Sequence, residues 1–253
     1  MRFAEQIAVV TGSSDGIGLA TAQRLAAEGA AVILNGRHPE RLERTANEIA
    51  GYGGRVASVV GDLTASGTVD AILALVRDRF GRIDVLVNNV GGGSPLRELE
   101  TITNEDWQAT LRLNLSSSFE LSRAMVPMMK SRGYGRIVNV SSVAGRHKGR
   151  LSGPQYSAAK AGMLGLTRHL AWDLARFGIS VNAIAPGFVA TERALAKWRE
   201  RCEEERREML SQVPMGRFAE PHEIAAAVAF LASPEASYIT GITLDVNGGS
   251  FMS

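Results

Sequence analysis

The amino-acid sequence predicts an α/β protein whose doubly wound, mostly parallel sheet of seven strands has helices on both faces. Short apolar segments with many β-branched residues alternate with longer helical patterns along the whole chain. The strand segments are apolar on both faces, which is typical of a parallel sheet buried between helices. The 253 residues show no internal repeat and no linker. We therefore expect a single domain over residues 1–253.

Each expected element follows from its local sequence. The first strand is the apolar run Ile7-Ala8-Val9-Val10, and the alanine-rich segment after it predicts a helix over 16–28. Glycines mark the ends of this helix and of four others, at positions 29, 51, 81, 133 and 178. The same criteria place strands at 7–10, 31–34, 55–60, 83–87, 136–140, 179–184 and 242–246. Further helices are expected at 39–50, 68–80, 104–129, 154–176 and 221–231.

The composition excludes several classes of protein. Lys and Arg number 28 against 26 Asp and Glu, a net charge of +2 that gives no broad basic surface for nucleic acid. The apolar runs are too short to span a membrane, and the N-terminus lacks a signal core. The single Cys202 forms no internal disulfide, so we expect a cytoplasmic protein. His38, His169 and His222 lack ligand spacing, and we expect no metal site.

A glycine-rich turn joins the first strand to the first helix. Residues 11–18 read Thr-Gly-Ser-Ser-Asp-Gly-Ile-Gly, with the spacing G-x3-G-x-G. Such a turn directs backbone N–H groups at one point, and the helix N-terminus adds partial positive charge. Taken alone it could be a tight connection, but the pattern predicts a pyrophosphate site.

Polar residues and glycines follow five of the predicted strands. In a doubly wound sheet, ligands bind beyond the carboxyl ends of the strands. These ends carry residues suited to holding a ligand, at 35–37, 61–63, 88–93, 141–145 and 185–187. Their agreement strengthens the prediction of a dinucleotide site at this edge.

The end of the second strand bears on the choice of cofactor. An acidic residue there would accept a hydrogen bond from a free ribose 2′-OH, but this chain has Gly36 followed by Arg37. Arginine would instead pair with a 2′-phosphate. Asp15 opposes this by repulsion, and Arg37 could be a simple surface residue. We expect NADP, with NAD as the alternative.

Tyr156 and Lys160 lie four residues apart in a predicted helix, one turn from each other on the same face. A phenol has a pKa near 10, and a neighbouring cation would lower it toward the range useful for proton transfer. This spacing is common, and a surface Tyr packed on a Lys is the simpler reading. Ser142 at a strand end makes the pattern specific, because its hydroxyl can polarise a carbonyl oxygen that Tyr156 protonates.

These motifs together resemble the short-chain dehydrogenase/reductase family in its single-domain form. The resemblance covers the whole chain. It rests on T-G-x3-G-x-G at 11–18, N-N-x-G at 88–91, the asparagine of Leu113-Asn114-Leu115, Ser142, Y-x3-K at 156–160 and Pro-Gly at 186–187. Val90 departs from the alanine usual in the family, and Asp15 from the basic residue frequent in members that select the phosphate. Of Ser141 and Ser142, which point to opposite faces, the family motif favours Ser142.

The resemblance implies a Rossmann-type fold that binds NAD(P) at the carboxyl edge of the sheet. Tyr156 would be the general acid/base and Ser142 would bind the substrate oxygen. Lys160 would hold the nicotinamide ribose, and Asn114 would position a water of a proton relay. Asp62 would contact adenine, and Asn89 and Thr191 the nicotinamide half. The expected cofactor-binding residues are Gly12, Ser14, Asp15, Gly16, Ile17, Gly18, Arg37, Asp62, Leu63, Asn89, Gly91, Tyr156, Lys160, Pro186, Gly187, Val189 and Thr191.

Two segments are candidates for contact with substrate. Residues 189–214 interrupt the strand–helix alternation with an incomplete apolar stripe and many charges, and their family counterpart is a mobile lid. Cys202 is expected to pack in this lid rather than act as a nucleophile. The basic loop 146–150 (Arg-His-Lys-Gly-Arg) could receive an anionic part of the substrate, with solvated surface charge as the alternative.

The sequence thus predicts an oxidoreductase that transfers a hydride between nicotinamide and a carbonyl or secondary alcohol. Reduction of a 3-oxoacyl thioester is the first candidate, and oxidation of a sugar acid or polyol is the second. A dinucleotide sensor without catalysis would not need Ser142, Tyr156 and Lys160. The family resemblance also implies a homotetramer, with Met163, Leu166 and Leu170 on outward helix faces.

Overall fold

A sheet of parallel strands forms the centre of the computed structural model, which describes residues 1–147 and 152–252. The seven strands follow the order β3-β2-β1-β4-β5-β6-β7, and every neighbouring pair is parallel. This confirms the predicted fold class. The strands are β1 (Ile7–Thr11), β2 (Ala31–Gly36), β3 (Val56–Val60), β4 (Val85–Asn88), β5 (Gly135–Val140), β6 (Ile179–Pro186) and β7 (Thr243–Val246).

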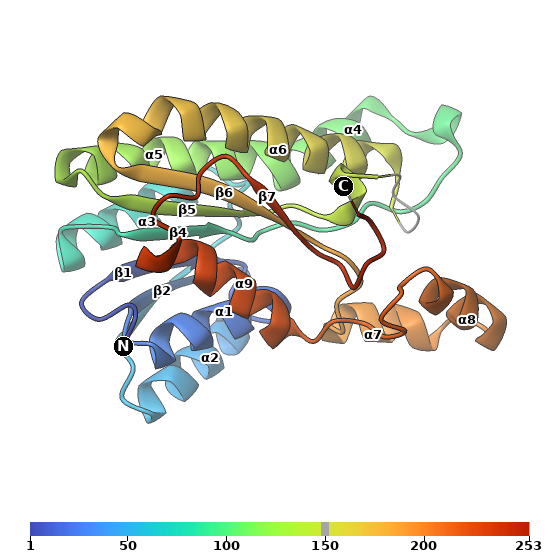
Figure 1. Cartoon of the computed structure of the whole chain (residues 1–253), viewed down its shortest axis with the longest axis horizontal. Helices are drawn as coiled ribbons and strands as arrows, with labels where there is room; N and C mark the ends of the chain where they lie inside the picture. The colour runs from blue at the N-terminus through green and yellow to red at the C-terminus, as the bar shows by residue number, and fades with distance from the viewer. Residues whose placement is uncertain (148–151, 253) are drawn as a thin grey trace.

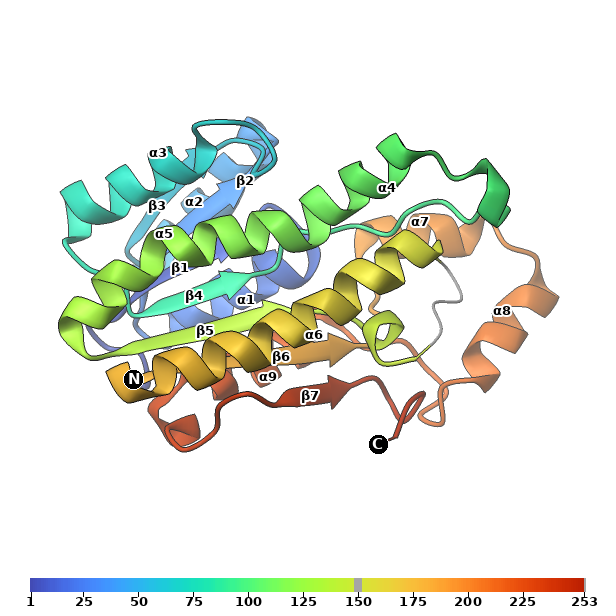
Figure 2. The same ribbon diagram turned by 90° about the horizontal axis from the view of Figure 1, so that it is seen from above.

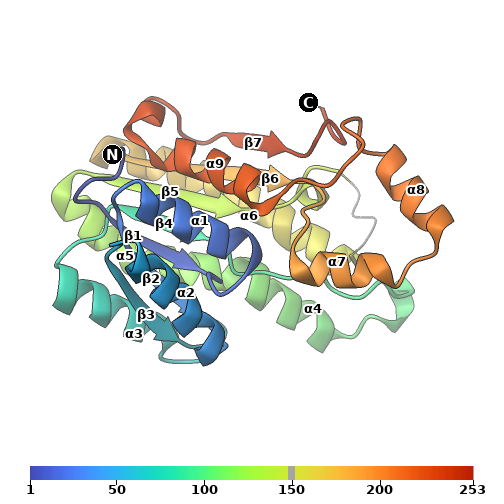
Figure 3. The same ribbon diagram turned by 90° about the horizontal axis from the view of Figure 1, so that it is seen from below.

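Helices cover both faces of the sheet. One face carries α1, α2 and α9, and the other carries α3, α5 and α6 (Figures 1, 2 and 3). Two further helices, α7 and α8, lie beyond the carboxyl ends of the strands (Figure 1). The helices are α1 (Gly16–Ala27), α2 (Pro39–Gly51), α3 (Thr68–Leu75), α4 (Asn104–Leu111), α5 (Ser117–Arg132), α6 (Pro154–Leu174), α7 (Glu192–Arg199), α8 (Glu203–Ser211) and α9 (Pro221–Ala232).

The alternation of side chains along each strand divides the core into two layers. In β1, Ala8 and Val10 belong to the cluster that includes Leu25 of α1. Their neighbour Val9 belongs to the opposite cluster, with Met125 of α5. Both faces of the strand are buried, so the sequence of a central strand is apolar throughout rather than alternating.

The helix expected at 104–129 is interrupted. Residues Arg112–Ser116 form a π-helical turn between α4 and α5, and Val76–Phe80 form another after α3. The turn at Arg112–Ser116 contains Asn114, whose fully buried side chain is fixed by hydrogen bonds to backbone groups of Gly92 and Thr110. An apolar pattern does not distinguish this widened turn from a regular helix, so the sequence missed it.

The strand order reverses between β1 and β4, and connections run to opposite sides from this point. In doubly wound sheets the crevice at such a position is the usual ligand site. Among the described residues no helix is long and apolar enough to cross a membrane.

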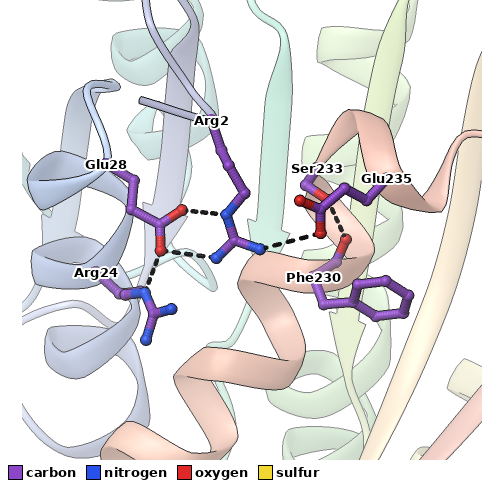
Figure 4. Close-up of polar contacts among 6 residues, drawn as sticks. All are labelled: Arg2, Arg24, Glu28, Phe230, Ser233 and Glu235. Carbon is purple, nitrogen blue, oxygen red and sulfur yellow. Dashed lines mark hydrogen bonds and ion pairs between the residues drawn. The ribbon is translucent and has the colours of Figure 1, made fainter.

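A cluster of charged residues joins the N-terminus to two helices (Figure 4). Arg2 donates to Glu28 at the end of α1 from Nε (2.5 Å) and from Nη2 (2.7 Å). Its Nη1 lies 3.5 Å from Glu235, in the segment after α9. Arg24 also pairs with Glu28. This cluster holds the first residues of the chain against the α1–α9 layer.

Candidate active site

A cavity of about 970 Å³ lies at the carboxyl edge of the sheet. Its wall contains most of the residues that the sequence predicted for the site. They are Gly12, Ser14, Asp15, Gly16, Ile17, Arg37, Asp62, Leu63, Asn89, Gly91, Ser142, Tyr156, Lys160, Pro186, Gly187, Val189 and Thr191. Gly18 and Asn114 lie behind the wall and support it.

The glycine-rich turn between β1 and α1 has the shape that a pyrophosphate site requires. Gly12 and Gly16 have φ values of +61° and +53°, which strain other residues. A Cβ on Gly18 would overlap the carbonyl oxygen of Gly12. The absence of side chains here lets the turn close tightly before the helix begins, and it leaves the N-terminus of α1 open to an anion. The residues present therefore fit a dinucleotide.

Thr11 and Asn89 connect this turn to the loop after β4. The Thr11 hydroxyl accepts hydrogen bonds from the N–H groups of Asn89 (2.9 Å) and Val90 (3.1 Å). The Asn89 amide donates to the carbonyl oxygens of Thr11 (2.9 Å) and Gly12 (3.2 Å). The side chain of Asn89 thus fixes the floor of the cavity, while its contact with the nicotinamide half stays a prediction.

Arg37 and Asp62 lie together at one end of the cavity, 3.6 Å apart between Nη1 and Oδ2. We call this the Arg37 end. Burial raises the pKa of Asp62, but hydrogen bonds from Thr64 and the charge of Arg37 outweigh it and leave that pKa below its usual value. Asp62 is therefore an ionised acceptor at neutral pH.

Arg41 of α2 adds a second guanidinium at this end, which was not predicted from the sequence. Its Nη1 lies 3.3 Å from Asp15 and 3.3 Å from Glu192. The arginine offsets the negative charge of Asp15 beside the glycine-rich turn. It also bridges that turn to the first residue of α7. The position of Arg41 two residues into a predicted helix was the only signal available in the sequence.

Tyr156 and Ser142 form the reaction end of the cavity, together with Lys160. Ser142 Oγ accepts from the N–H of Ala144 (3.1 Å) and hydrogen-bonds with Tyr156. The neighbouring Ser141 donates instead to the carbonyl oxygen of Lys160 (2.9 Å) and is buried. The geometry thus favours Ser142 over Ser141 as the residue that meets a substrate oxygen.

The pKa of Tyr156 differs from the sequence-based expectation. Burial raises it above 10.0, and a hydrogen bond with Ser142 and the charge of Arg193 oppose that increase. The Lys160 ammonium lies 5.8 Å from the ring centroid of Tyr156 and donates to the carbonyl oxygen of Val140 (2.8 Å). Burial lowers the pKa of Lys160 to about 8. The expected lowering of the Tyr156 pKa by Lys160 is therefore not seen: the groups that lower it are Ser142 and Arg193, and burial outweighs both.

Asn114 and two glycines form the wall beside Lys160. Asn114 Oδ1 accepts from the N–H of Gly92 (2.9 Å), and its Nδ2 donates to the carbonyl oxygen of Gly92 (3.1 Å). A Cβ on Gly91 would come within 3.0 Å of Lys160 Nζ. Asn114 thus fixes the loop against the lysine, and its part in a proton relay stays a prediction.

The segment predicted as a lid comprises α7 and α8, which border the cavity with Arg193, Trp198 and Met209. Thr191 caps α7, since its hydroxyl accepts from the N–H of Ala194 (3.2 Å). Trp198 packs edge-on against Phe218, with ring centroids 4.7 Å apart. The prediction that Cys202 packs in this lid was wrong. Its side chain is exposed at the start of α8, where sequence spacing did not show which side faced solvent.

The basic loop is only partly described. Arg146 pairs with Asp245 of β7 (3.0 Å) and stacks over the ring of Phe251. Lys148 and Arg150 lie outside the described residues. Besides Lys160, α7 brings Arg193 to the reaction end, beside Gly92 and Tyr156, and Lys197 also lines the cavity. Which lid residues face the cavity could not be predicted from the sequence.

The chain is similar over its whole length to several known proteins. A family model described as enoyl-(acyl carrier protein) reductase matches residues 12–250. The 3-oxoacyl-[acyl-carrier-protein] reductase FabG of Vibrio cholerae is 42% identical over 252 residues and 100% of both chains. The (2S)-[(R)-hydroxy(phenyl)methyl]succinyl-CoA dehydrogenase subunit BbsD of Thauera aromatica is 39% identical over 98% of both. YwfH, an NADPH-dependent reductase involved in bacilysin biosynthesis, superposes with a TM-score of 0.92 at 30% identity, over 98% of this chain and 99% of its own.

The fold and the site define an oxidoreductase whose class uses a nicotinamide dinucleotide. The chain belongs to the short-chain dehydrogenase/reductase family, as its motifs predicted.

Proposed function

We propose that this protein is an NADPH-dependent reductase of 3-oxoacyl thioesters. The observation that carries the proposal is the convergence of Ser142, Tyr156 and Lys160 at one end of a cavity whose other end fits a dinucleotide. The names of FabG and BbsD, which cover the whole chain, both refer to thioesters of acyl carrier protein or coenzyme A. Reduction adds one hydride to the carbonyl carbon and one proton to its oxygen, which gives an alcohol.

NADPH, when bound along the glycine-rich turn and the Arg37 end, would supply the hydride. The Ser142 hydroxyl donates a hydrogen bond to the substrate carbonyl oxygen and so polarises it. The Tyr156 hydroxyl gives its proton to that oxygen as negative charge develops there. With a raised pKa, Tyr156 is fully protonated at neutral pH and suited to act as the acid. Lys160 joins α6 to the end of β5 through its hydrogen bond to the carbonyl oxygen of Val140, and it adds positive charge near the tyrosine.

The preference for NADPH rests on the Arg37 end. Arg37 and Arg41 bring two guanidinium groups to the place where a 2′-phosphate would lie, and Arg41 offsets the charge of Asp15. The relative YwfH is described as NADPH-dependent. NAD is the alternative if the negative charge of Asp62 outweighs the positive charges of Arg37 and Arg41, because a 2′-phosphate would then be repelled.

The proposal extends to three wider properties. The segment 189–214 acts as a lid over substrate, since α7 and α8 border the cavity. The protein assembles as a homotetramer, which the family resemblance supports. It works in the cytoplasm, which is consistent with its single cysteine.

The test is turnover of 3-oxobutanoyl-N-acetylcysteamine by wild type and Tyr156→Phe, followed as NADPH oxidation. We expect a loss of about 10²–10⁴-fold in kcat with little change in NADPH affinity, because only the proton donor is removed. Tyr238→Phe, a change at a fully exposed tyrosine, is the matched control. Turnover by Tyr156→Phe above a tenth of wild type would contradict the assignment. NADPH binding by wild type without turnover of any carbonyl would favour a dinucleotide sensor.

A further inference from the structure

Arg193 is a cation at the reaction end that the proposed reduction does not use. It lies in the first turn of α7, directly after the pair formed by Glu192 and Arg41. Its guanidinium covers Gly92, since a Cβ on that glycine would come within 3.1 Å of Nη1. Its charge also reaches Tyr156, whose pKa it lowers against the effect of burial. The side chain therefore faces the space where the reacting carbonyl must lie.

The charges around the cavity are distributed unevenly. The acidic residues of the wall are Asp15, Asp62 and Glu192, and each pairs with Arg37 or Arg41. Within residues 1–147 and 152–252, no carboxylate oxygen lies within 4 Å of the cationic nitrogens of Arg193 or Lys197. These two cations are four residues apart on α7 and both line the cavity.

Like charges one helical turn apart repel each other, and this repulsion destabilises a helix modestly. An anion bound between Arg193 and the reaction end would relieve it. The side chains of Arg193 and Lys197 are exposed to solvent in a cavity that Trp198 and Phe218 also line, and a neutral carbonyl substrate would displace water there without supplying a counter-charge. The wall thus favours a substrate that brings its own negative charge close to the carbonyl.

We propose that Arg193 binds a carboxylate that the substrate carries near its reacting carbonyl. This inference rests on the proposed reduction and specifies its substrate class. Two kinds of substrate share the chemistry: a free oxo acid, and an acyl thioester whose acyl chain ends in a carboxylate. The guanidinium would hold the carboxylate through paired hydrogen bonds, as arginine commonly does. Lys197 would add attraction from one turn further along the helix.

The kinetic test compares matched substrates on wild type, Arg193→Gln and the control Arg199→Gln. Arg199 is exposed on the same helix and does not line the cavity. One pair is the N-acetylcysteamine thioesters of 3-oxohexanedioate and 3-oxohexanoate, and the other is 3-oxobutanoate and its ethyl ester. For at least one pair, we expect wild type to prefer the carboxylate. Arg193→Gln should reduce this preference in kcat/KM by about 10- to 100-fold, mainly through KM.

The two pairs identify the source of the carboxylate. A preference confined to the first pair indicates a carboxylated thioester, and one confined to the second pair indicates a free oxo acid. Equal preference in wild type and Arg193→Gln would overturn the proposal. The proposal would also be overturned if Arg193→Gln weakened NADPH binding by as large a factor as it raised the KM of the substrate, since Arg193 would then serve the cofactor.

A binding measurement separates this proposal from the proposed function. In a Tyr156→Phe background, calorimetry with NADP⁺ present measures the affinity for 3-hydroxybutanoate and for the thioester of 3-hydroxyhexanedioate. We expect the additional change Arg193→Gln to weaken the binding of at least one of these two ligands by about tenfold or more. No change in either affinity overturns the role of Arg193, even if wild type reduces carbonyls. Failure of wild type to reduce any carbonyl overturns the proposed function, while an Arg193-dependent affinity would still support the carboxylate site.

Discussion

At the scale of single residues, Lys160 shows how the site departs from simple expectations. Its side chain is 2% exposed, and burial lowers its pKa to about 8. The sequence predicted Lys160, Tyr156 and Ser142 together, because their spacing places them on one helix face and one strand end. It did not predict the balance of burial against charge, because that balance depends on how closely separate segments pack.

Replacing Lys160 by Met should stabilise the fold at neutral pH. Below pH 8 the folded and unfolded states both carry the proton, and the buried charge costs on the order of 3 kcal/mol. Between pH 8 and about 10.5 the unfolded state binds more protons, so wild-type stability rises with pH and the advantage of Lys160→Met shrinks. Urea unfolding at pH 7 and pH 9.5 measures this, with Lys197→Met on the exposed lid as control. If the gain in unfolding free energy from Lys160→Met were the same at pH 7 and pH 9.5, the lowered pKa of Lys160 would be contradicted.

Arg37→Ala should weaken NADPH binding far more than NADH binding, because only NADPH offers a 2′-phosphate. One charged hydrogen bond contributes about 1.5–3 kcal/mol, or roughly 10- to 150-fold in affinity. Fluorescence titration of both cofactors measures the effect. Arg44→Ala, a change at an exposed arginine within α2 that does not line the cavity, should leave both affinities near wild type. Losses of similar size for NADPH and NADH would argue against a phosphate contact.

At the scale of elements, the regular strands and helices agree with those predicted from the sequence, whereas the interruptions of the helices were not predicted. Each buried strand was recognisable from its apolar run. Gly29, Gly81, Gly133 and Gly178 follow helices with positive φ as predicted, but Gly51 lies inside α2 and Gly53 has the positive φ after it. The π-helical turn at Arg112–Ser116 and the direction of the side chains of α7 were not recognisable. Both depend on tertiary contacts: Asn114 with Gly92, and Arg193 over the same glycine.

Arg2→Met should loosen the attachment of the N-terminus to α1 and to the segment after α9. A partly buried ion pair of this kind contributes about 1 kcal/mol. Hydrogen bonding from Arg2 lowers the pKa of Glu28 below 4.5, so the contribution is present at neutral pH and is lost as the pH falls through that lowered value. Denaturant unfolding at pH 7 and pH 3 tests this against the exposed control Arg55→Met. A destabilisation equal at both pH values would exclude the ion pair as its cause.

At the scale of the whole molecule, the sheet order and the position of the cavity follow from general rules for alternating strands and helices. The prediction of outward-facing Met163 was wrong, because that residue is fully buried. Leu166 and Leu170 are half-buried. The exposed aromatic residues on α4, α5 and α6 are instead Trp107, Phe119 and Trp172. The apolar pattern of α6 does not show which of its sides faces the sheet, because nearly all of its sides carry apolar residues.

The exposed aromatic side chains support the predicted tetramer. Light scattering at micromolar concentration should give about four times the chain mass of 27.0 kDa. Phe119→Glu should lower that mass, because it places a charge on the face expected to be covered. Tyr52→Glu, at an exposed aromatic residue after α2, should leave it unchanged. A wild-type mass near 27 kDa would rule out the tetramer.

The π-helical turn between α4 and α5 also sets a rotational phase. Each residue of an α-helix advances the side chains by about 100°, so one residue more or less turns everything beyond it by that angle. The stripe of Leu121, Met125 and Met129 on α5 and the exposed Trp107 on α4 are related through this turn. This turn uses one extra residue for nearly the same rotation as a regular turn, so deleting a single residue within 112–116 would give a continuous α-helix with α4 and α5 in almost the same orientation. It would instead displace Asn114, whose side chain holds the backbone of Gly92 in the wall of the cavity.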